Sequence, residues 1–564
     1  MPDAAILLGL LVLHLVLTAL PGVAAVLLGA HLGLRSVPLL LALGLFATAA
    51  LAMLDFWAFY AEPMVGKSLA FLIVFGSVLA IGWLLWERRI ERALLRQLSI
   101  PLALWALGTG FLAFLGFVHG DVNDPIVTSM TRFSGVMPTD NIVPLYFSDW
   151  FFHHGRHGTP PPFAGDWLSS DRPPLQIGFT LLQRTFFWDN RGMNYQAMGI
   201  GLQQLWIVGL WALLLAGRAG RVTRAVALGT VLLSDIAIVN GFFVWPKMLP
   251  AALLLAAAAL VLTPLWDEVK GSLWGAALFA GLLALALLGH GANVFGALPL
   301  ALVALFRSGL PSWRWLGVAA LVGLVLMTPW SAYQRWGDPP GNRLTKWYLG
   351  GAVDIDQRGI GETIVDGYRE AGLGGTIDNK SENFAAIVGA DPDLFANNVE
   401  TARNALDAGD WENVVRPIRS IFFFSLLPSL GLLLLGPLAM LVGYRRRARA
   451  PNEWRLAVAC LGTFALGTLL WALILFGGFD AQAVIHQGSY LLPVLGIVAG
   501  VLGLRAVYPR FALWWLGLNA VLMLAIYIPA YEPPEGTSFS LAMALLAAAS
   551  LAGFAAVTLD RGAE

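Results

Sequence analysis

Long, uninterrupted apolar runs recur along this 564-residue chain and limit what it can fold into. Runs of roughly 17 to 25 residues match the thickness of a lipid bilayer when they are helical, and a helix satisfies its own backbone hydrogen bonds inside the membrane. The runs are continuous rather than alternating, which excludes a β-barrel. With 58% hydrophobic and 12% charged residues, the composition is also far from that of a soluble globular protein. We therefore predict an all-α polytopic transmembrane protein with about 13 to 15 transmembrane helices.

Short loops rich in arginine set the expected orientation. They span residues 87–96, 218–224, 307–314, 445–455 and 505–510, and the positive-inside rule places them in the cytoplasm. Two long polar loops, residues 120–195 and 334–419, then fall on the opposite face as two extracytoplasmic loop domains. Arginine far outnumbers lysine, a habit of bacterial genomes rich in G and C. We expect a multi-pass protein of the bacterial cytoplasmic (inner) membrane with its active site facing the periplasm.

The long loops divide the chain into four expected parts. Residues 1–98 form an amino-terminal module of about three transmembrane helices and an interfacial helix. Residues 99–333 form a transmembrane core that contains the first periplasmic loop, residues 334–419 form a folded cap with breaks at Gly350-Gly351 and Gly372–Gly375, and residues 420–564 form a carboxy-terminal module. The single cysteine, Cys460, cannot form an intramolecular disulfide. The formal net charge is zero, so we expect no nucleic-acid partner.

Two carboxylates open the first loop. Asp121 and Asp124 directly follow the fourth apolar run, which places them at the outer membrane surface. A carboxylate there can accept a proton from a hydroxyl nucleophile or orient a divalent ion. The alternative is structural, because Asp-x-x-Asp-Pro is also favourable turn and helix-start chemistry. As a catalytic base, Asp124 is slightly favoured over Asp121.

The first loop closes on Asp171-Arg172-Pro173-Pro174-Leu175, a charge pair followed by a rigid start to an apolar segment. Proline suits the first turn of a helix that begins at the membrane interface. An arginine just ahead of a helix N-terminus is well placed to hold a phosphate, and the helix dipole adds to the attraction. Arg172 is therefore a candidate phosphate-binding residue, with Asp171 as its support.

Further candidates lie where apolar runs meet the outer face. Lys247 can bind the same phosphate, or it can be an interfacial lysine beside an anchoring tryptophan. His290, flanked by glycines, and His486 can hydrogen-bond a phosphate or be satisfied interfacial histidines. Asp235 lies within an apolar run, where an unpaired carboxylate is costly, so a functional or hydrogen-bonded role is the default. The remaining supporting candidates are Asn240 in an outer turn and Arg343 and Lys346 in the second loop.

A loop with acidic residues just after its leading span, followed by Asp-Lys/Arg-Pro-Pro-Leu before the next span, resembles the GT-C membrane glycosyltransferases. The resemblance is to the branch of aminoarabinose transferases and protein O-mannosyltransferases and covers mainly residues 99–300. The residues that carry it are Asp121 or Asp124 and Asp171-Arg172-Pro173-Pro174-Leu175. It implies a GT-C-like fold, a polyprenyl-phosphate-linked sugar as donor, a carboxylate near the acceptor, and a basic residue on the lipid phosphate, a part that Arg172 would play. In that family the loop usually follows the first span, so residues 1–98 are expected to be an added module.

The expected activity is transfer of a hexosyl or pentosyl group, with inversion, from the polyprenyl-phosphate donor to an acceptor hydroxyl on a cell-envelope glycan or lipid. Mg²⁺ or Mn²⁺ can assist without being required, with Asp121, Asp124 and His290 as the candidate ligands. Three alternatives stay open: a glycan polymerase or ligase that uses lipid-diphosphate-linked oligosaccharides, a transporter or flippase, and a non-catalytic scaffold. A transporter predicts charged residues along a path at mid-membrane, whereas the candidates here, apart from Asp235, gather at one face.

Overall fold

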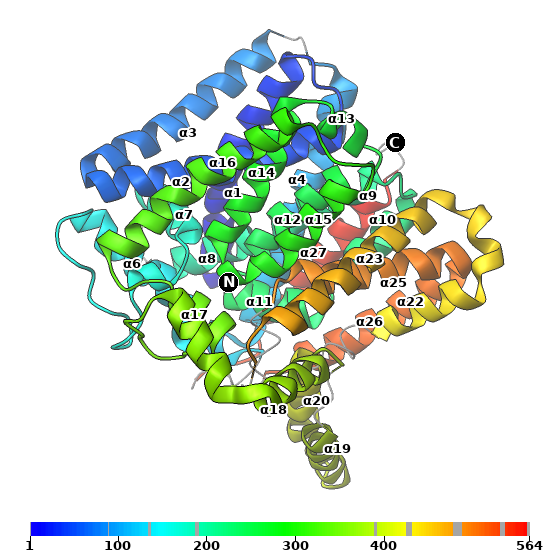
Figure 1. The fold of residues 1–564 in the computed structure, drawn as a ribbon. Helices are drawn as coiled ribbons and strands as arrows, with labels where there is room; N and C mark the ends of the chain where they lie inside the picture. Colours follow the sequence, from blue (N-terminus) through cyan, green and yellow to red (C-terminus); the bar gives the residue numbers. More distant parts are fainter. Residues whose placement is uncertain are drawn as a thin grey trace.

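The computed structural model is built from helices (Figure 1) and describes residues 2–87, 90–133, 137–186, 191–388, 392–424, 431–477, 488–530 and 536–560. No β-strand forms within these ranges. In the same ranges, nine helices are long and apolar enough to span a membrane, and the pair α10 (Arg221–Leu232) and α11 (Asp235–Phe243), bent by 56°, is a tenth candidate. The protein is therefore an all-α polytopic membrane protein, as predicted. The higher number of about 13 to 15 spans stays a prediction, because the other apolar helices of the described chain have only 10–17 residues.

The helices that precede the first loop pack against the rest of the bundle. They are α1 (Pro2–His31), α2 (Val37–Ala61), α3 (Pro63–Trp86) and α4 (Arg92–Gly116). Residues of α2 share one hydrophobic core with the later helices, and α1 lies against the span that follows the first loop. The buried His14 side chain of α1 is hydrogen-bonded to Gln183 (2.7 Å) and Asn194 (2.8 Å). Residues 1–98 thus contribute to the same core as the rest of the bundle.

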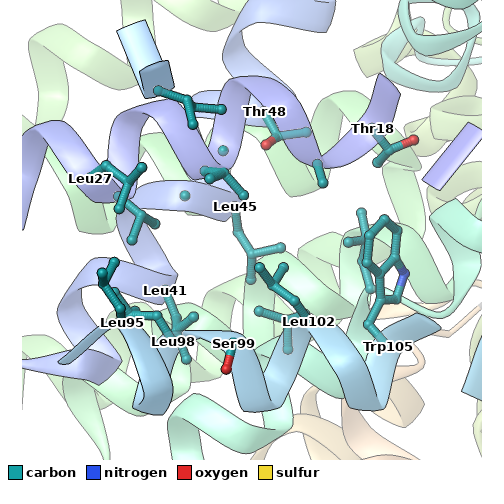
Figure 2. Close-up of a pocket in the computed structure, with 18 of the residues that line it drawn as sticks. Thr18, Leu27, Leu41, Leu45, Thr48, Leu95, Leu98, Ser99, Leu102 and Trp105 are labelled. Atoms are coloured by element: carbon teal, nitrogen blue, oxygen red, sulfur yellow. The ribbon is translucent and has the colours of Figure 1, made fainter. Parts of the chain in front are cut away.

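A small apolar cavity of about 240 Å³ lies between α1, α2, the end of α3, α4 and the middle of the next long span. Figure 2 shows side chains of these helices turned toward a common space, among them Leu27, Leu45, Leu102 and Trp105. The polar groups among its labelled lining are the hydroxyls of Thr18, Thr48 and Ser99 and the indole N–H of Trp105, which donates to the Gly201 carbonyl at 2.8 Å. This space therefore suits hydrocarbon rather than water.

The first loop is a folded helical segment. Its elements are η1 (Phe117–His119), α5 (Pro125–Thr131), η2 (Thr139–Ile142), α6 (Val143–His154), η3 (Ser169–Asp171) and α7 (Leu175–Arg184). Every residue of α7 is buried, and the helix packs against α2 and α6. The loop is thereby anchored to the bundle immediately after the Pro173-Pro174 pair.

The centre of the bundle is α12 (Met248–Val261), which is buried at every residue and lies among the surrounding helices in Figure 1. Its many alanines let neighbours approach closely, which is how membrane helices pack. The other helices of this part of the chain are α8 (Arg191–Gln203), α9 (Trp206–Ala216), α13 (Trp266–Lys270), α14 (Leu273–Gly289), η4 (Gly291–Asn293), α15 (Val294–Phe306) and α16 (Trp313–Ala332). α8 and α9 together form one candidate span, Arg191–Ala216. The two ends of such a span lie at the two opposite faces of the membrane protein.

The second loop forms a helical cap that projects from one end of the bundle, at the bottom of Figure 1. It consists of η5 (Tyr333–Gly337), α17 (Arg343–Gly350), α18 (Ile360–Val388), α19 (Pro392–Asp407) and α20 (Trp411–Phe424). Both predicted breaks are present. Gly351 ends α17 in the left-handed region (φ 77°) and Gly372 interrupts α18 (φ 62°), backbone angles that glycine adopts without steric cost.

The carboxy-terminal helices complete the bundle. They are α22 (Gly431–Val442), η6 (Tyr444–Arg449), α23 (Pro451–Ile474), α25 (Leu491–Val507), α26 (Pro509–Tyr527) and α27 (Leu541–Thr558). α23 packs against α25 and α15, whereas α27 returns across the molecule to lie along α4. The two ends of the chain therefore contribute to the same core.

Candidate functional site

An ion pair between Arg172 and Asp140 forms the centre of the candidate site. The Arg172 guanidinium donates from Nη2 to Asp140 Oδ2 at 2.5 Å, and the two side chains are only 10% and 12% exposed. Burial of this kind strengthens a charge-assisted hydrogen bond. Asp140 lies in η2, 32 residues before Arg172 in the chain, and the sequence analysis did not select it.

Lys247 and His290 complete a cluster of basic side chains around this pair. The charges of Arg172 and Asp140 both act on Lys247, and those of Lys247 and Arg172 act on His290. Lys247 is 3% exposed and His290 is 1% exposed. The Lys247 ammonium also lies 4.6 Å from the Trp245 ring centroid and 5.7 Å from that of Tyr490, contacts that favour a cation.

Two hydrogen-bond donors in this cluster have no protein partner among the described residues. The backbone N–H of Ala292 donates to His290 Nδ1 (3.2 Å), which assigns the imidazole proton to Nε2 when the ring is neutral. Neither His290 Nε2 nor Arg172 Nε makes a hydrogen bond within the described chain, although both are buried. Buried polar groups are normally satisfied, so these two donors are available to a bound anion.

The backbone before Lys247 is held in an unusual conformation. Val244 adopts left-handed angles (φ 57°, ψ 25°), which a β-branched residue rarely does. Its side chain packs against Gly199, and its carbonyl accepts a hydrogen bond from Gln176 Nε2 (3.2 Å). Gln203 Oε1 accepts the first two N–H groups of α12, each at 3.0 Å. The surroundings therefore fix the turn that presents Lys247.

A second set of hydrogen bonds holds the segment that carries Asp140. The Tyr195 hydroxyl donates to the Asn141 carbonyl at 2.6 Å and accepts from Gln176 Nε2 at 2.9 Å. Asn141 Nδ2 donates to Ser129 Oγ at 3.1 Å. Gln176 thus contacts the Lys247 turn directly and the Asp140 segment through the Tyr195 hydroxyl, so the two sides of the cluster share one hydrogen-bond network.

Asn240 and Asp235 border the cluster through Tyr490. The Tyr490 hydroxyl donates to Asn240 Oδ1 at 3.0 Å, and the charge of Asp235 acts on the same tyrosine. Asp235 is completely buried as the first residue of α11, where the helix dipole favours a carboxylate. Asn240 therefore lies one side chain away from Lys247, and Asp235 lies within electrostatic reach of the same tyrosine.

The cap contacts the first loop next to Arg172. Arg343 pairs with Asp166 at 2.9 Å, and its guanidinium lies 4.1 Å from the ring centroid of Trp167, whose ring is 4.6 Å from the Arg172 guanidinium. Lys346 Nζ donates to the Asp356 carbonyl within the cap. Asp338, which sequence reasoning missed, accepts hydrogen bonds from Ser169 N–H (2.9 Å) and Ser169 Oγ (2.6 Å). These contacts join the two loops over the site.

Asp171 does not pair with its neighbour Arg172. Its carboxylate accepts the Leu168 N–H at 2.9 Å, and burial raises the pKa of the Asp171 carboxyl to about 6, against the opposing effects of the Leu168 hydrogen bond and the Arg343 charge. Its role in the structure is to close η3, the short turn that precedes Arg172.

Asp121 and Asp124 are engaged in local structure at the start of the loop. Asp124 Oδ1 caps α5 by accepting the Val127 N–H at 3.3 Å, while Asp121 Oδ1 accepts the N–H (2.8 Å) and the side-chain amide (3.0 Å) of Asn123. Asp124 is exposed and Asp121 is partly exposed. The carboxylate that holds Arg172 is that of Asp140, so the structure does not bring the predicted acidic pair into the Arg172 ion pair.

Two expectations concern residues or ligands that the structure leaves open. His486 lies outside the described residues. The described part of the chain contains no group of three His, Cys, Asp or Glu side chains that can hold a metal ion, and we assign no step to Mg²⁺ or Mn²⁺.

Taken together, the cluster offers three basic side chains and one carboxylate from four separate segments. Such a set of donors can bind a phosphate, and the carboxylate can take up a proton once it is released from the arginine. No protein-family model, curated protein or solved structure matches the chain. The function is therefore inferred from the chemistry of these residues.

Proposed function

We propose that this protein is a GT-C type integral membrane glycosyltransferase that transfers a sugar from a polyprenyl-phosphate donor to an acceptor hydroxyl of a cell-envelope glycan or lipid. The observation that supports the proposal best is that the basic side chains of Arg172, Lys247 and His290 lie close together beside the buried Arg172–Asp140 ion pair. With the arginine-rich loops in the cytoplasm, this cluster faces the extracytoplasmic side. We place the protein in the bacterial inner membrane on the same argument.

The donor phosphate would bind where the buried donors are concentrated. Arg172 and Lys247 would balance its charge, and the unpartnered Nε2–H of His290 would donate to one of its oxygens. A polyprenyl chain needs a lipid environment, whereas its phosphate needs cations near the interface. A membrane protein with a basic cluster at one face of its helices meets both needs.

The phosphate would compete with Asp140 for Arg172 and thereby release a carboxylate inside the site. In a single displacement, the acceptor hydroxyl oxygen forms a bond to the anomeric carbon while the bond from that carbon to the phosphate oxygen breaks. The electron pair leaves with the phosphate, where Arg172 and Lys247 stabilise it, and the hydroxyl proton passes to the carboxylate. Asp140 is the carboxylate that the geometry favours for this role. The result is inversion at the anomeric carbon.

The test is transfer of radiolabelled sugar from a panel of polyprenyl-phosphate sugars by the purified protein in lipid. We expect wild type to transfer from one of these donors, Arg172→Ala and Lys247→Met to lose roughly 100-fold or more in rate, and Asp140→Asn to lose a comparable factor. Arg191→Ala is the matched control, because it removes an exposed ion pair with Asp149 outside the cluster. It should retain activity.

The rival functions are separated by the same assay. If no polyprenyl-phosphate sugar is consumed while a lipid-diphosphate oligosaccharide is, the protein is a polymerase or ligase. If neither is consumed and a solute or lipid crosses the bilayer, it is a transporter or flippase. Full activity in all three cluster variants would refute the assignment of the site even if transfer occurs.

A further inference from the structure

A large groove opens at the opposite end of the bundle from the Arg172 cluster. It has a volume of about 860 Å³ and lies between the ends of α9, α12 and α15 and the first half of α23. Its lining is apolar along the helices, including Leu302, Val303 and Leu466, and changes to basic at its rim. The outermost apolar residues, Phe306 (69% exposed) and Val458 (50% exposed), face away from protein.

Three arginines line the rim, one from each of three separate segments: Arg218, Arg307 and Arg455. All three are exposed, and no ion pair joins any of them to another described residue. No acidic side chain is part of the described lining. Two carboxylates lie near the rim. Asp267 interacts electrostatically with Arg307, and Glu453 accepts a hydrogen bond from the Gly220 N–H at 3.1 Å. The rim therefore gathers positive charge that the described protein neutralises only in part.

The backbone holds two of these arginines in place. Arg218 adopts a left-handed conformation (φ 57°) directly after α9, at a position where glycine is usual and another residue is strained. Arg307 Nη1 donates to the Val261 carbonyl in the last turn of α12, which leaves its other N–H groups at the rim. Both arginines line the same groove.

The groove and the Arg172 cluster are separate sites. Lys247 precedes the first residue of α12, whereas Leu262 and Thr263 of the groove follow its last. His290 precedes α15, whereas Arg307 follows it. With 1.5 Å rise per residue, a helix the length of α12 separates them by roughly 20 Å.

We propose that this groove binds an anionic glycerophospholipid of the cytoplasmic leaflet. The lipid phosphate is held by Arg218, Arg307 and Arg455, and an acyl chain lies in the apolar part between α15 and α23. Charge complementarity at the rim and an exposed apolar wall beneath it match the two halves of such a lipid. The inference is independent of the proposed glycosyl transfer, because it uses none of the cluster residues.

Native mass spectrometry of the detergent-purified protein, titrated with phosphatidylglycerol or phosphatidylcholine, tests this proposal. Wild type should retain phosphatidylglycerol in preference to phosphatidylcholine. The triple variant R218Q/R307Q/R455Q should lose about tenfold or more in phosphatidylglycerol binding. The control triple R92Q/R314Q/R510Q changes the net charge equally at other exposed arginines and should bind as wild type does. An equal loss of phosphatidylglycerol binding in both triple variants would mean that net charge alone causes the effect, and it would overturn the proposed site.

The acyl-chain half of the proposal is tested without touching a charge. Gly462 lines the groove on α23, and a Cβ added there meets nothing within 4 Å, so Gly462→Leu fills the groove without disturbing the fold. It should also lower phosphatidylglycerol binding by about tenfold. Gly517→Leu on α26, another glycine with open space, is its control. Unchanged binding in Gly462→Leu, or displacement of the lipid by glycerol phosphate at equal concentration, would overturn a lipid site in favour of a headgroup site alone.

Discussion

At the scale of single residues, three aspartates of the first loop differ in the groups with which their carboxylates interact. Asp124 caps a helix, Asp121 closes a turn, and Asp140 holds a buried arginine. The same functional group can therefore serve structure or chemistry, and substitution separates the two roles.

We predict that Asp124→Ala destabilises the protein by about 1 kcal/mol, because α5 loses its N-cap. Asp124→Asn should keep nearly all of that stability, since asparagine caps helices as well as aspartate does. Thermal unfolding followed by tryptophan fluorescence measures both. If Asp124→Asn folds as wild type does but abolishes sugar transfer, the carboxylate is the catalytic base and the capping role is secondary.

The sequence allowed the basic half of the site to be predicted, but not its acidic partner. Arg172, Lys247 and His290 each stand beside a local signal: a Pro-Pro helix start, a Trp-Pro-Lys turn and a Gly-His-Gly turn. Asp140 has no such signal, because only tertiary folding brings it to Arg172. Asp121 and Asp124 were selected because they directly follow the fourth span. Helix-capping residues also occur at such positions. The Asp171-Arg172 charge pair suggested an interaction that the extended backbone at Arg172 does not form.

At the scale of elements, the turn between α11 and α12 depends on close contact with α8. A Cβ at Gly199 would lie 2.7 Å from Val244 Cγ1 and 2.8 Å from Val244 Cβ, too close for the turn to stay in place. A Cβ at Gly201, two residues further along the same helix, would lie 3.4 Å from its nearest atom, which is an ordinary van der Waals contact.

We predict that Gly199→Ala costs about 1 to 3 kcal/mol of stability through overpacking and lowers sugar transfer because Lys247 moves. Gly201→Ala is the matched control, with the same gain in helix propensity of about 1 kcal/mol, and should be neutral or stabilising. Unfolding temperatures and transfer rates of the two variants check this. Equal behaviour of both would mean that α11 and α12 can shift without consequence for the site.

At the scale of the whole molecule, the amino-terminal helices were expected to be an added module, and in the structure α1 and α2 contribute to the same core as the later helices. His14 reaches Gln183 and Asn194, and Arg343 and Asp338 of the second loop hold Asp166 and Ser169 of the first. Apolar runs predicted helices well because each run satisfies its own backbone. They could not predict which helices meet, because that depends on side-chain packing between distant segments.

The expected orientation gives a prediction for the intact protein. Glu400→Cys in the cap should react with a membrane-impermeant maleimide on whole cells, whereas Glu268→Cys in α13 should react only after permeabilisation. Both positions are exposed, and the native Cys460 is completely buried, so wild type should stay unlabelled and no cysteine needs to be removed. The reverse pattern of labelling would move the Arg172 cluster to the cytoplasmic face.

The ion pair between Asp140 and Arg172 also bears on how a catalytic cycle would end. A ligand must supply at least as much negative charge as the carboxylate it displaces, so a neutral lipid cannot open the pair. Once the sugar has left, the spent carrier lipid has dissociated and Asp140 has released the acceptor proton to water, its carboxylate can pair with Arg172 again. On the proposed function, the protein thus contains its own product-release device: a tethered anion that resets the site after each turnover.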